Sequence, residues 1–264
     1  MKEIHSSSLY ALTNFILKKP TSWVLSHPEY QLDPEEEGVL NTYLSRLVSR
    51  EPLAYITGIQ FFFGLEFNVT PYVLIPRPET EILVEQAIQA SRQFQRPLAI
   101  ADVGTGSGCI SITLAKSLSS TRIIATDISF DALRIAKSNI QRHKAGNYVH
   151  LVQANLLNGI YTKFHIICAN LPYIPTEKLS KLSVLKYEPR IALDGGKDGL
   201  VFIKQLLQGI QGKLYAGGVV ILEIENTQVS KFLIICKEIL PSASCTIIND
   251  LAGLPRVAVI KIDG

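Results

Sequence analysis

An alternation of apolar runs and helical patterns constrains the fold of this chain more than any other feature. Seven strand-like runs occur at residues 98–103, 121–126, 148–152, 164–169, 218–224, 245–249 and 257–262. Helical patterns at residues 109–118, 130–142, 199–211 and 229–240 separate several of them. This order is typical of a mostly parallel sheet with helices on both faces. It predicts an α/β fold whose ligand site lies at the carboxyl ends of the strands.

The first third of the chain has a different pattern and predicts helices. One helix is expected over residues 8–18, and a second begins at Asp33-Pro34, where Asp33 suits the N-cap and Pro34 the first helical position. Residues 61–69 form two β-like runs around Gly64, which predicts a hairpin. We therefore expect a helical domain with a terminal hairpin over residues 1–75 and an α/β domain over residues 76–264.

Composition excludes several classes of protein. No stretch has the roughly 18 unbroken apolar residues of a membrane helix, and the first residues lack the apolar core of a signal peptide. The four cysteines and five histidines show no metal-binding spacing, so no metal site is expected. Without paired cysteines, a reduced, cytoplasmic environment is the natural expectation.

The net charge of +3 is small but unevenly distributed. Residues 1–96 contain 8 basic and 11 acidic residues, a net charge of −3, and residues 97–264 therefore contribute +6. A net charge of +3 does not by itself indicate a nucleic-acid partner.

The first chemical signal is a glycine-rich turn after the 98–103 run. The sequence Asp102-Val103-Gly104-Thr105-Gly106-Ser107-Gly108 joins an apolar strand to a helix. Its glycines allow positive φ angles and a close approach of a ligand to the backbone. The spacing differs from the dinucleotide fingerprint, and Asp102 suits a cationic ligand better than a pyrophosphate. A tight turn without a ligand is the alternative.

A second acid ends the next strand and strengthens the case for a ligand. Asp127 lies about 20 residues beyond the last glycine, where a carboxylate can accept hydrogen bonds from both ribose hydroxyls. Asp127 also suits the start of a helix. Taken together, Asp102, the glycine turn and Asp127 resemble the S-adenosylmethionine site of class I methyltransferases, which have a Rossmann-like, seven-stranded sheet.

The third signal is Asn170-Leu171-Pro172-Tyr173, directly after the 164–169 run. It resembles the Asn-Pro-Pro-Tyr motif of methyltransferases that act on planar nitrogens, with Leu171 in place of the first proline. The Asn170 side-chain oxygen and the Leu171 main-chain carbonyl could accept the two hydrogens of an amide. These two hydrogen bonds would favour the pyramidal, more nucleophilic form of the nitrogen as positive charge develops on it. Pro172 would stiffen the turn and Tyr173 would pack on the target group.

The tetrapeptide does not indicate whether the methylated group is an amide or an adenine, because ribosomal RNA adenine dimethyltransferases also have Asn-Leu-Pro-Tyr. The flanking segments distinguish the two. The runs Arg50-Glu51-Pro52-Leu53-Ala54-Tyr55-Ile56-Thr57-Gly58, Ile75-Pro76-Arg77-Pro78-Glu79-Thr80-Glu81 and Asp194-Gly195-Gly196-Lys197-Asp198-Gly199-Leu200 closely resemble the PrmC/HemK family. Those enzymes methylate the glutamine amide of peptide chain release factors, which implies a class 1 release factor as the substrate and S-adenosylmethionine as the cofactor.

The resemblance implies a role for each site residue. Asp102, Gly104, Thr105, Gly106, Ser107 and Gly108 would surround the methionine part of the cofactor, Asp127 would hold the ribose, and Asn155 and Leu156 would lie near the adenine, where the family more often has an Asp and an aromatic residue. Asn170, which also borders the cofactor, would hold the glutamine with Leu171, Pro172 and Tyr173. Arg77 would either approach the pocket and contact substrate or form an interdomain ion pair.

Three functions are weighed. We expect methylation of the glutamine N5 atom in the Gly-Gly-Gln motif of release factors by a monomeric enzyme that binds no nucleic acid directly. An adenine-N6 methyltransferase for RNA or DNA and a catalytically silent cofactor-binding module are the alternatives. The negative charge of the first 96 residues disfavours the former, and the intact Asp102, Asp127, Asn170 and Tyr173 disfavour the latter. Residues 1–50 do not decide between substrate recognition and a scaffold role.

Overall fold

The computed structural model describes residues 6–180 and 183–262 and divides the chain into two compact units, Met1–Ile59 and Gln60–Gly264. The first unit is helical, as expected. It contains α1 (Ser6–Leu17), α2 (Thr21–Ser26), α3 (Pro34–Val48) and α4 (Leu53–Thr57). No helix among the described residues is long and apolar enough to cross a membrane.

Helix α3 begins where the sequence predicted. The Asp33 carboxylate accepts a hydrogen bond from the Glu36 backbone N–H at 2.8 Å, and the Glu36 carboxylate accepts one from the Asp33 N–H at 3.0 Å. This capping box satisfies two backbone donors that a helix start otherwise leaves unpaired. Further along, the Arg46 guanidinium pairs with Glu51 and donates to the Tyr55 carbonyl at 3.1 Å, which ties α3 to α4.

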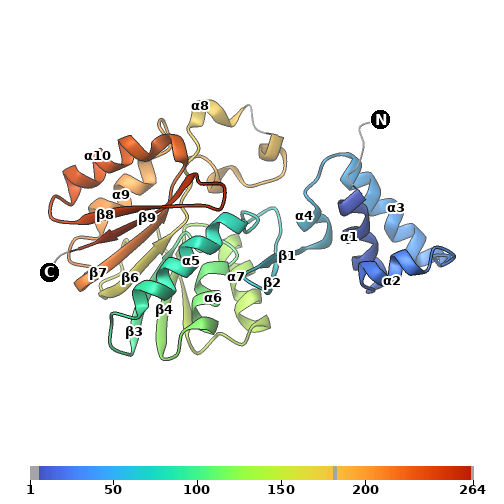
Figure 1. Ribbon diagram of the computed structural model, residues 1–264, viewed down its shortest axis with the longest axis horizontal. Helices are drawn as coiled ribbons and strands as arrows, with labels where there is room; N and C mark the ends of the chain where they lie inside the picture. The colour runs from blue at the N-terminus through green and yellow to red at the C-terminus, as the bar shows by residue number, and fades with distance from the viewer. Residues whose placement is uncertain (1–5, 181–182, 263–264) are drawn as a thin grey trace. The chain divides into compact units, whose positions relative to one another are not determined.

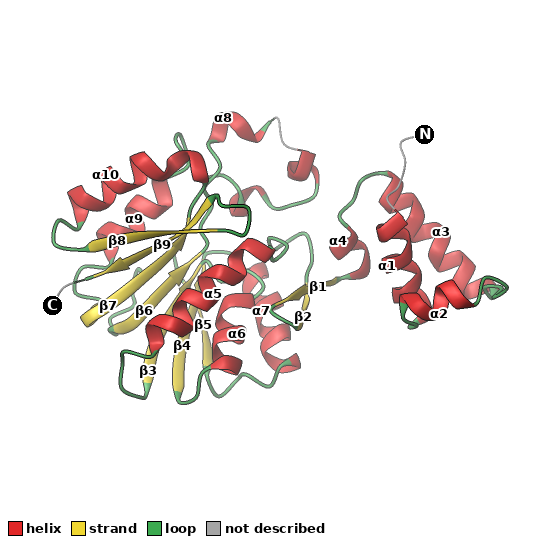
Figure 2. Ribbon diagram, in the orientation of Figure 1, coloured by secondary structure: helices red, strands yellow, loops and turns green. Residues whose placement is uncertain are grey.

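The second unit is built on a seven-stranded sheet with the order β5-β4-β3-β6-β7-β9-β8 (Figures 1 and 2). The strands are β3 (Leu98–Val103), β4 (Thr121–Asp127), β5 (Val149–Gln153), β6 (Phe164–Ala169), β7 (Leu214–Glu223), β8 (Ser244–Asn249) and β9 (Pro255–Lys261). Strands β3 to β7 pair in parallel, and β9 is antiparallel to both of its neighbours. The predicted Rossmann-like, mostly parallel seven-stranded sheet is confirmed.

Strand β3 lies between β4 and β6 in this order, which places the three strand ends that carry the motifs side by side. Its residue Asp102 is in register with Ala125 of β4 and with Cys168 of β6. Because parallel strands end at the same edge, the glycine-rich turn, Asp127 and Asn170 all lie at the carboxyl edge of the sheet.

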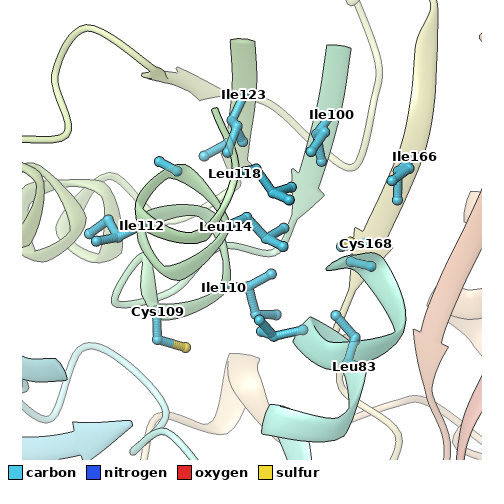
Figure 3. Packing of buried hydrophobic residues seen from close by; sticks show 14 of the residues in the cluster. Leu83, Ile100, Cys109, Ile110, Ile112, Leu114, Leu118, Ile123, Ile166 and Cys168 are labelled. Atoms are coloured by element: carbon cyan, nitrogen blue, oxygen red, sulfur yellow. The ribbon is translucent and has the colours of Figure 1, made fainter. Parts of the chain in front are cut away.

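Helices cover both faces of the sheet. The core on one face joins α5 (Pro78–Ser91), α6 (Cys109–Ser117) and α7 (Phe130–Arg142), and the core on the other joins α9 (Val201–Gly209) and α10 (Val229–Ile239). Figure 3 shows Leu114 and Leu118 directed from the α6 region toward Ile100 and Ile123 on the strands. Both faces are therefore buried, which accounts for the nearly continuous apolar runs in the sequence.

The predicted hairpin forms from β1 (Ile59–Phe62) and β2 (Leu65–Asn68), with Gly64 at φ 72° in the turn. The domain boundary predicted from sequence, after residue 75, assigned this hairpin to the helical domain. In the structure, Phe62 and Phe67 are fully buried and belong to the core of the second unit. The hairpin is thus part of the α/β unit because its two aromatic side chains pack there.

A long connection separates β6 from β7 and contains elements that the sequence did not predict. It includes the short helix α8 (Thr176–Leu179) and two 3-10 turns, Ser183–Lys186 and Arg190–Ala192. Helices α2 and α4 were also not predicted. All are only one or two turns long, too short for a helical periodicity to be visible in sequence.

Candidate active site

The glycine-rich turn between β3 and α6 is wound tightly by positive φ angles. Gly104, Gly106 and Gly108 have φ of 74°, 54° and 82°. The Gly104 and Thr105 N–H groups both donate to the Thr126 carbonyl at 2.8 Å, which fastens the turn to the end of β4. A Cβ atom at Gly104 would come within 3.1 Å of the Leu171 side chain, so this glycine also allows the turn after β6 to approach.

Asp102 lies beneath this turn and is fully buried. Its Oδ2 accepts hydrogen bonds from the Thr105 hydroxyl at 2.6 Å and from the Ser111 N–H at 3.1 Å. Burial raises the pKa of Asp102 to about 6, and the bonds from Thr105 and Ser111 oppose that rise. Through Oδ2 the carboxylate therefore holds the loop in shape. Oδ1 is buried without a hydrogen-bond partner among the described residues, so it remains available to accept a hydrogen bond.

Asp127 occupies the end of β4 and faces the same loop. Its Oδ2 accepts from the Gly106 N–H and its Oδ1 from the Ser129 N–H, each at 2.9 Å. Burial raises the pKa of Asp127, and these backbone bonds oppose the shift. A carboxylate has about four lone-pair positions, so both oxygens can still accept a hydroxyl hydrogen.

These elements surround one cavity, which has about 1100 Å³ of empty space including its mouth open to solvent. Of the residues singled out in the sequence, those that line it are Arg77, Gly104, Thr105, Gly106, Ser107, Asp127, Asn155, Leu156, Asn170, Leu171 and Pro172. Asp102 and Gly108 lie below the lining. The tertiary structure therefore gathers at one edge segments that are nearly 100 residues apart.

The cavity suits S-adenosylmethionine, the methyl donor of class I methyltransferases. A Cβ atom at Gly106 would meet nothing within 4 Å, so the backbone there is open to a ligand. Asp127 offers acceptors to hydroxyl groups, and Asp102 keeps an unpartnered acceptor under the loop. Apolar side chains, including Ile128, Ala132 and Leu156, line the wall beyond Asp127. The residues present thus fit a cationic nucleoside with ribose hydroxyls and a flat base.

The turn after β6 forms a second wall of the cavity, beside the glycine-rich turn. Asn170 Nδ2 donates to the Thr80 hydroxyl at 3.0 Å. Leu171 is buried, in keeping with an aliphatic side chain in place of a proline. Tyr173 is not among the residues that line the cavity, and its hydroxyl donates to Glu223 Oε1 at 3.2 Å. Burial and the nearby Glu223 charge raise the pKa of Tyr173 well above its usual range.

A glycine-containing segment supports this turn from behind. Gly195 N–H donates to the Ile174 carbonyl at 2.8 Å. A Cβ atom at Gly195 would lie 2.7 Å from the Pro172 carbonyl oxygen and 2.8 Å from the Tyr173 Cα. Gln228 Nε2 donates to the Tyr173 carbonyl at 2.8 Å and to the Asp198 carbonyl at 3.1 Å. The segment Asp194 to Leu200 therefore needs glycine because it lies against the backbone of the Asn170 turn.

Arg77 both lines the cavity and forms an ion pair. Its Nη2 lies 2.6 and 2.7 Å from the two carboxylate oxygens of Glu188. Burial raises the pKa of Glu188, and the Arg77 charge opposes that rise. Both residues belong to the second unit. The pair therefore links the start of α5 to the connection between β6 and β7 within one unit, and the interdomain ion pair considered from sequence is not the arrangement found.

Sequence reasoning assigned no role to three residues that hold the Asn170 turn, namely Thr80, which also lines the cavity, Glu223 and Gln228. The Thr80 hydroxyl donates to Glu223 Oε2 at 2.6 Å. A signal for Glu223 existed, since it is an acid at the end of an apolar strand, as Asp102 and Asp127 are. Thr80 and Gln228 carry no comparable signal, because an ordinary polar residue reveals its partner only in three dimensions.

Comparisons with known proteins agree with this geometry. A family model described as PrmC N-terminal domain matches residues 5–58, and one described as Methyltransferase small domain matches residues 79–186. The release factor glutamine methyltransferase of Coxiella burnetii (strain RSA 493 / Nine Mile phase I) is 37% identical over 256 residues, covering 95% of this chain and 89% of the relative. The protein of the same name from Geobacter sulfurreducens (strain ATCC 51573 / DSM 12127 / PCA) is 41% identical over 196 residues, covering 73% and 67%.

A solved structure shows the same fold. The methyltransferase from Pyrococcus furiosus superimposes with a TM-score of 0.55 at 23% identity, covering 84% of this chain and 98% of the other.

Proposed function

The chain belongs to the release factor glutamine methyltransferase family, and on this premise we propose that it methylates the glutamine side-chain amide nitrogen in the Gly-Gly-Gln motif of class 1 peptide chain release factors. One observation carries the assignment. Asn170 and Leu171 line the same cavity as the glycine-rich turn and Asp127, so an acceptor pair and a cofactor site share one space.

The chemistry follows from the residues on the two walls. S-adenosylmethionine, when bound, supplies a methyl group activated by a sulfonium centre. An amide nitrogen is a weak nucleophile because its lone pair is delocalised into the carbonyl. Asn170 Oδ1 and the Leu171 carbonyl would accept its two hydrogens and stabilise the positive charge that develops on it. Holding the methyl donor and the amide nitrogen next to each other supplies much of the remaining rate acceleration.

The carboxylates have a binding role in this proposal. Asp127 would accept the ribose hydroxyls, and the backbone from Gly104 to Ser107 would lie along the methionine part of the cofactor. Asn155 and Leu156 also line the cavity, and the adenine would lie beside them. Asp102 would keep the loop in shape through Thr105 and Ser111.

The test is to locate the transferred methyl group. The protein is incubated with a class 1 release factor and isotope-labelled S-adenosylmethionine, and peptides are analysed by mass spectrometry. Label is expected on the motif glutamine and is expected to vanish when that glutamine is replaced by alanine. Label in RNA or DNA, or on another side chain of the release factor, would overturn the proposal.

A variant of the enzyme completes the test. Asn170→Ala is expected to lower kcat by at least about 100-fold, as removal of a key transition-state hydrogen bond does elsewhere, with cofactor affinity close to wild type. Asn158→Ala, an exposed asparagine in the loop after β5, is the matched control and should keep full activity. Equal activity of both variants would remove Asn170 from the mechanism.

Recognition of the release factor itself is proposed for the helical unit. Its surface carries exposed apolar side chains, including Leu25 at 58% and Val48 at 66% exposure, which a protein partner would cover. Leu25→Asp with Val48→Asp should raise KM for the intact release factor but not for a short peptide containing Gly-Gly-Gln. Leu251→Asp, an exposed leucine in the loop before β9, is the control. Unchanged KM for the intact factor would assign the helical unit a scaffold role.

A further inference from the structure

Asn170 is the first member of a hydrogen-bonded chain that joins three elements of the α/β unit. Its Nδ2 donates to Thr80 Oγ1 at 3.0 Å, and the Thr80 hydroxyl donates to Glu223 Oε2 at 2.6 Å. Thr80 belongs to the first turn of α5, and Glu223 is the last residue of β7. Thr80 is 2% exposed and Glu223 is 1% exposed, so water does not compete for the Thr80–Glu223 bond, and the Asn170–Thr80 bond is partly buried. The chain therefore holds one end of the Asn170 amide in a fixed place.

The carboxylate of Glu223 determines the direction of every bond in this chain. An ionised carboxylate accepts hydrogen bonds and cannot donate them. The single hydrogen of the Thr80 hydroxyl is used on Glu223, so only its lone pairs remain for Asn170. Asn170 must then meet Thr80 with its NH₂ group. An amide turned by 180° would place Oδ1 against a hydroxyl oxygen that has no hydrogen to give. Oδ1 would then lack a hydrogen-bond donor there, which costs free energy.

Charged and polar neighbours support the ionised form of Glu223. Burial raises the pKa of this carboxyl group above its usual range and the negative charge of Glu79 adds to the rise, whereas the hydrogen bond from Thr80, the positive charge of Arg256 and the hydrogen bond from Tyr173 oppose it. Tyr173 donates to Oε1 and Thr80 to Oε2, so each carboxylate oxygen has its own hydroxyl donor. The same group thereby fixes both ends of the Asn170-to-Tyr173 turn.

We propose that Glu223 and Thr80 are positioning residues that act through Asn170 and present its Oδ1, rather than its NH₂ group, to the reacting nitrogen. This inference rests on the proposed function, in which that oxygen accepts a hydrogen of the glutamine amide. An acceptor at this position favours a nitrogen that carries hydrogens, whereas an NH₂ group there would repel it. The chain of bonds thus contributes to the choice of substrate atom as well as to rate.

A purely structural role makes different predictions, because the same bonds also tie α5 to β7. Loss of a structural tie lowers the melting temperature and leaves the kinetics of the remaining folded enzyme unchanged. Loss of a positioning bond lowers kcat at unchanged KM in enzyme that is fully folded. Assays below the melting temperature of every variant separate the two.

The kinetic experiment uses three threonine variants with a release factor as substrate. Thr80→Val removes the hydroxyl at nearly constant volume, and kcat is expected to fall about 100-fold, the cost of a misplaced catalytic group, at unchanged KM and cofactor affinity. Thr80→Ser keeps the hydroxyl and should restore most of the activity. Thr113→Val is the matched control, since this buried α6 threonine has a hydroxyl without a partner among the described residues. Wild-type kcat in Thr80→Val, or a Thr80→Ser variant as slow as Thr80→Val, would overturn the proposal.

Glu223→Gln tests whether the Glu223 carboxylate sets the direction of the hydrogen bonds from Asn170 to Thr80 and from Thr80 to residue 223. Glutamine can donate as well as accept, so the orientation of Asn170 is no longer imposed, and kcat should fall by less than in Thr80→Val. Glu225→Gln makes the same change two residues later, where the carboxylate caps a 3-10 turn, and should keep the wild-type kcat. Equal kcat values for wild type and Glu223→Gln would remove Glu223 from the proposal.

A spectroscopic readout judges the positioning independently of catalysis. The side-chain NH₂ signals of Asn170 are assigned in ¹⁵N-labelled protein by their absence in Asn170→Asp. One hydrogen should exchange slowly with water in wild type and in Thr113→Val, and rapidly in Thr80→Val. Signals that Thr80→Val leaves unchanged would overturn the positioning proposal. An enzyme that shows this protection but transfers no methyl group to the release factor would overturn the proposed function alone.

Discussion

The two walls of the cavity are assembled in different ways. On the glycine-rich side, Thr105 and Ser111 bind Asp102 from only three and nine residues away. On the Asn170 side, Asn170 and Thr80 are 90 residues apart, and Thr80 and Glu223 are 143 residues apart. One wall is formed by β3, the glycine-rich turn, α6 and the end of β4, which follow one another in the chain, whereas the other requires α5, β6 and β7 to be in place together.

This difference implies that the two walls can be damaged separately. A local loop keeps its shape when distant segments shift, whereas a turn held by remote contacts does not. Changes at remote positions should therefore abolish methyl transfer and spare cofactor binding, whereas changes within the first wall should weaken cofactor binding and leave the Asn170 turn in place. The predictions below test this separation in order of decreasing effect.

The largest effect is expected from Gly195→Ala. The new Cβ atom would lie within 2.8 Å of backbone atoms of Pro172 and Tyr173, which cannot move aside as a flexible side chain can. We expect loss of about 3 kcal/mol or more in the free energy of unfolding and loss of most activity. Urea denaturation and single-turnover methyl transfer measure the two quantities.

The control for this variant is Gly209→Ala at the end of α9, where a Cβ atom meets nothing within 4 Å. It should leave stability and activity close to wild type. Cofactor affinity of folded Gly195→Ala, measured by calorimetry, should also stay close to wild type. Equal loss of cofactor affinity and of methyl transfer would show that the two walls are not separable.

Asp102→Asn should change the pH dependence of stability. Because the pKa of Asp102 is raised from 3.8 to about 6, the folded state binds its proton more tightly than the unfolded state. The wild type therefore loses stability relative to the variant as pH rises from about 4 to about 6, by up to about 3 kcal/mol. Denaturation series at several pH values measure the difference. Asp131→Asn, a change at a half-exposed aspartate on α7, should show no such trend. A difference that is constant over this window would contradict the prediction.

Asp127→Ala tests the first wall directly. Loss of a carboxylate that accepts hydroxyl hydrogens should weaken cofactor binding by about 10- to 100-fold, as measured by calorimetry with S-adenosylhomocysteine. The slow exchange of the Asn170 side-chain hydrogens should persist, because the Thr80 bond does not involve the β4 end. Asp131→Ala is the matched control. Unchanged cofactor affinity would remove Asp127 from the binding site.

The smallest effect is expected from the Arg77–Glu188 pair, which joins residues 111 apart. Arg77→Met leaves the buried Glu188 carboxylate without its partner, and since Arg77 is 36% exposed we expect a loss of about 1 kcal/mol at neutral pH. The loss should shrink as pH falls through the raised pKa of Glu188, because the protonated group needs no partner. A double-mutant cycle with Glu188→Gln measures the coupling. An additive cycle would show that the pair contributes nothing.

Sequence patterns were sufficient for most of the fold. The runs that became β3 and β6 were predicted with the bounds that the structure gives, because strands buried on both faces are nearly all apolar. The α3 start was readable because an N-cap residue, Asp33, is followed directly by Pro34 at the first helical position, and both signals lie within one turn. The packing partner of the hairpin was not readable, since Phe62 and Phe67 would suit the core of either unit.

For the site, the sequence by itself determined the residues that meet at the carboxyl edge: Asp102, the glycines, Asp127 and the Asn170 turn. Each is marked by its place directly after an apolar strand, and parallel pairing brings strand ends together. Only the tertiary structure decided how Asn170 is held, why Gly195 must be a glycine and which carboxylate Arg77 pairs with. These depend on contacts between segments that are far apart in the chain, and a polar side chain in a sequence carries no record of the partner that folding will bring to it.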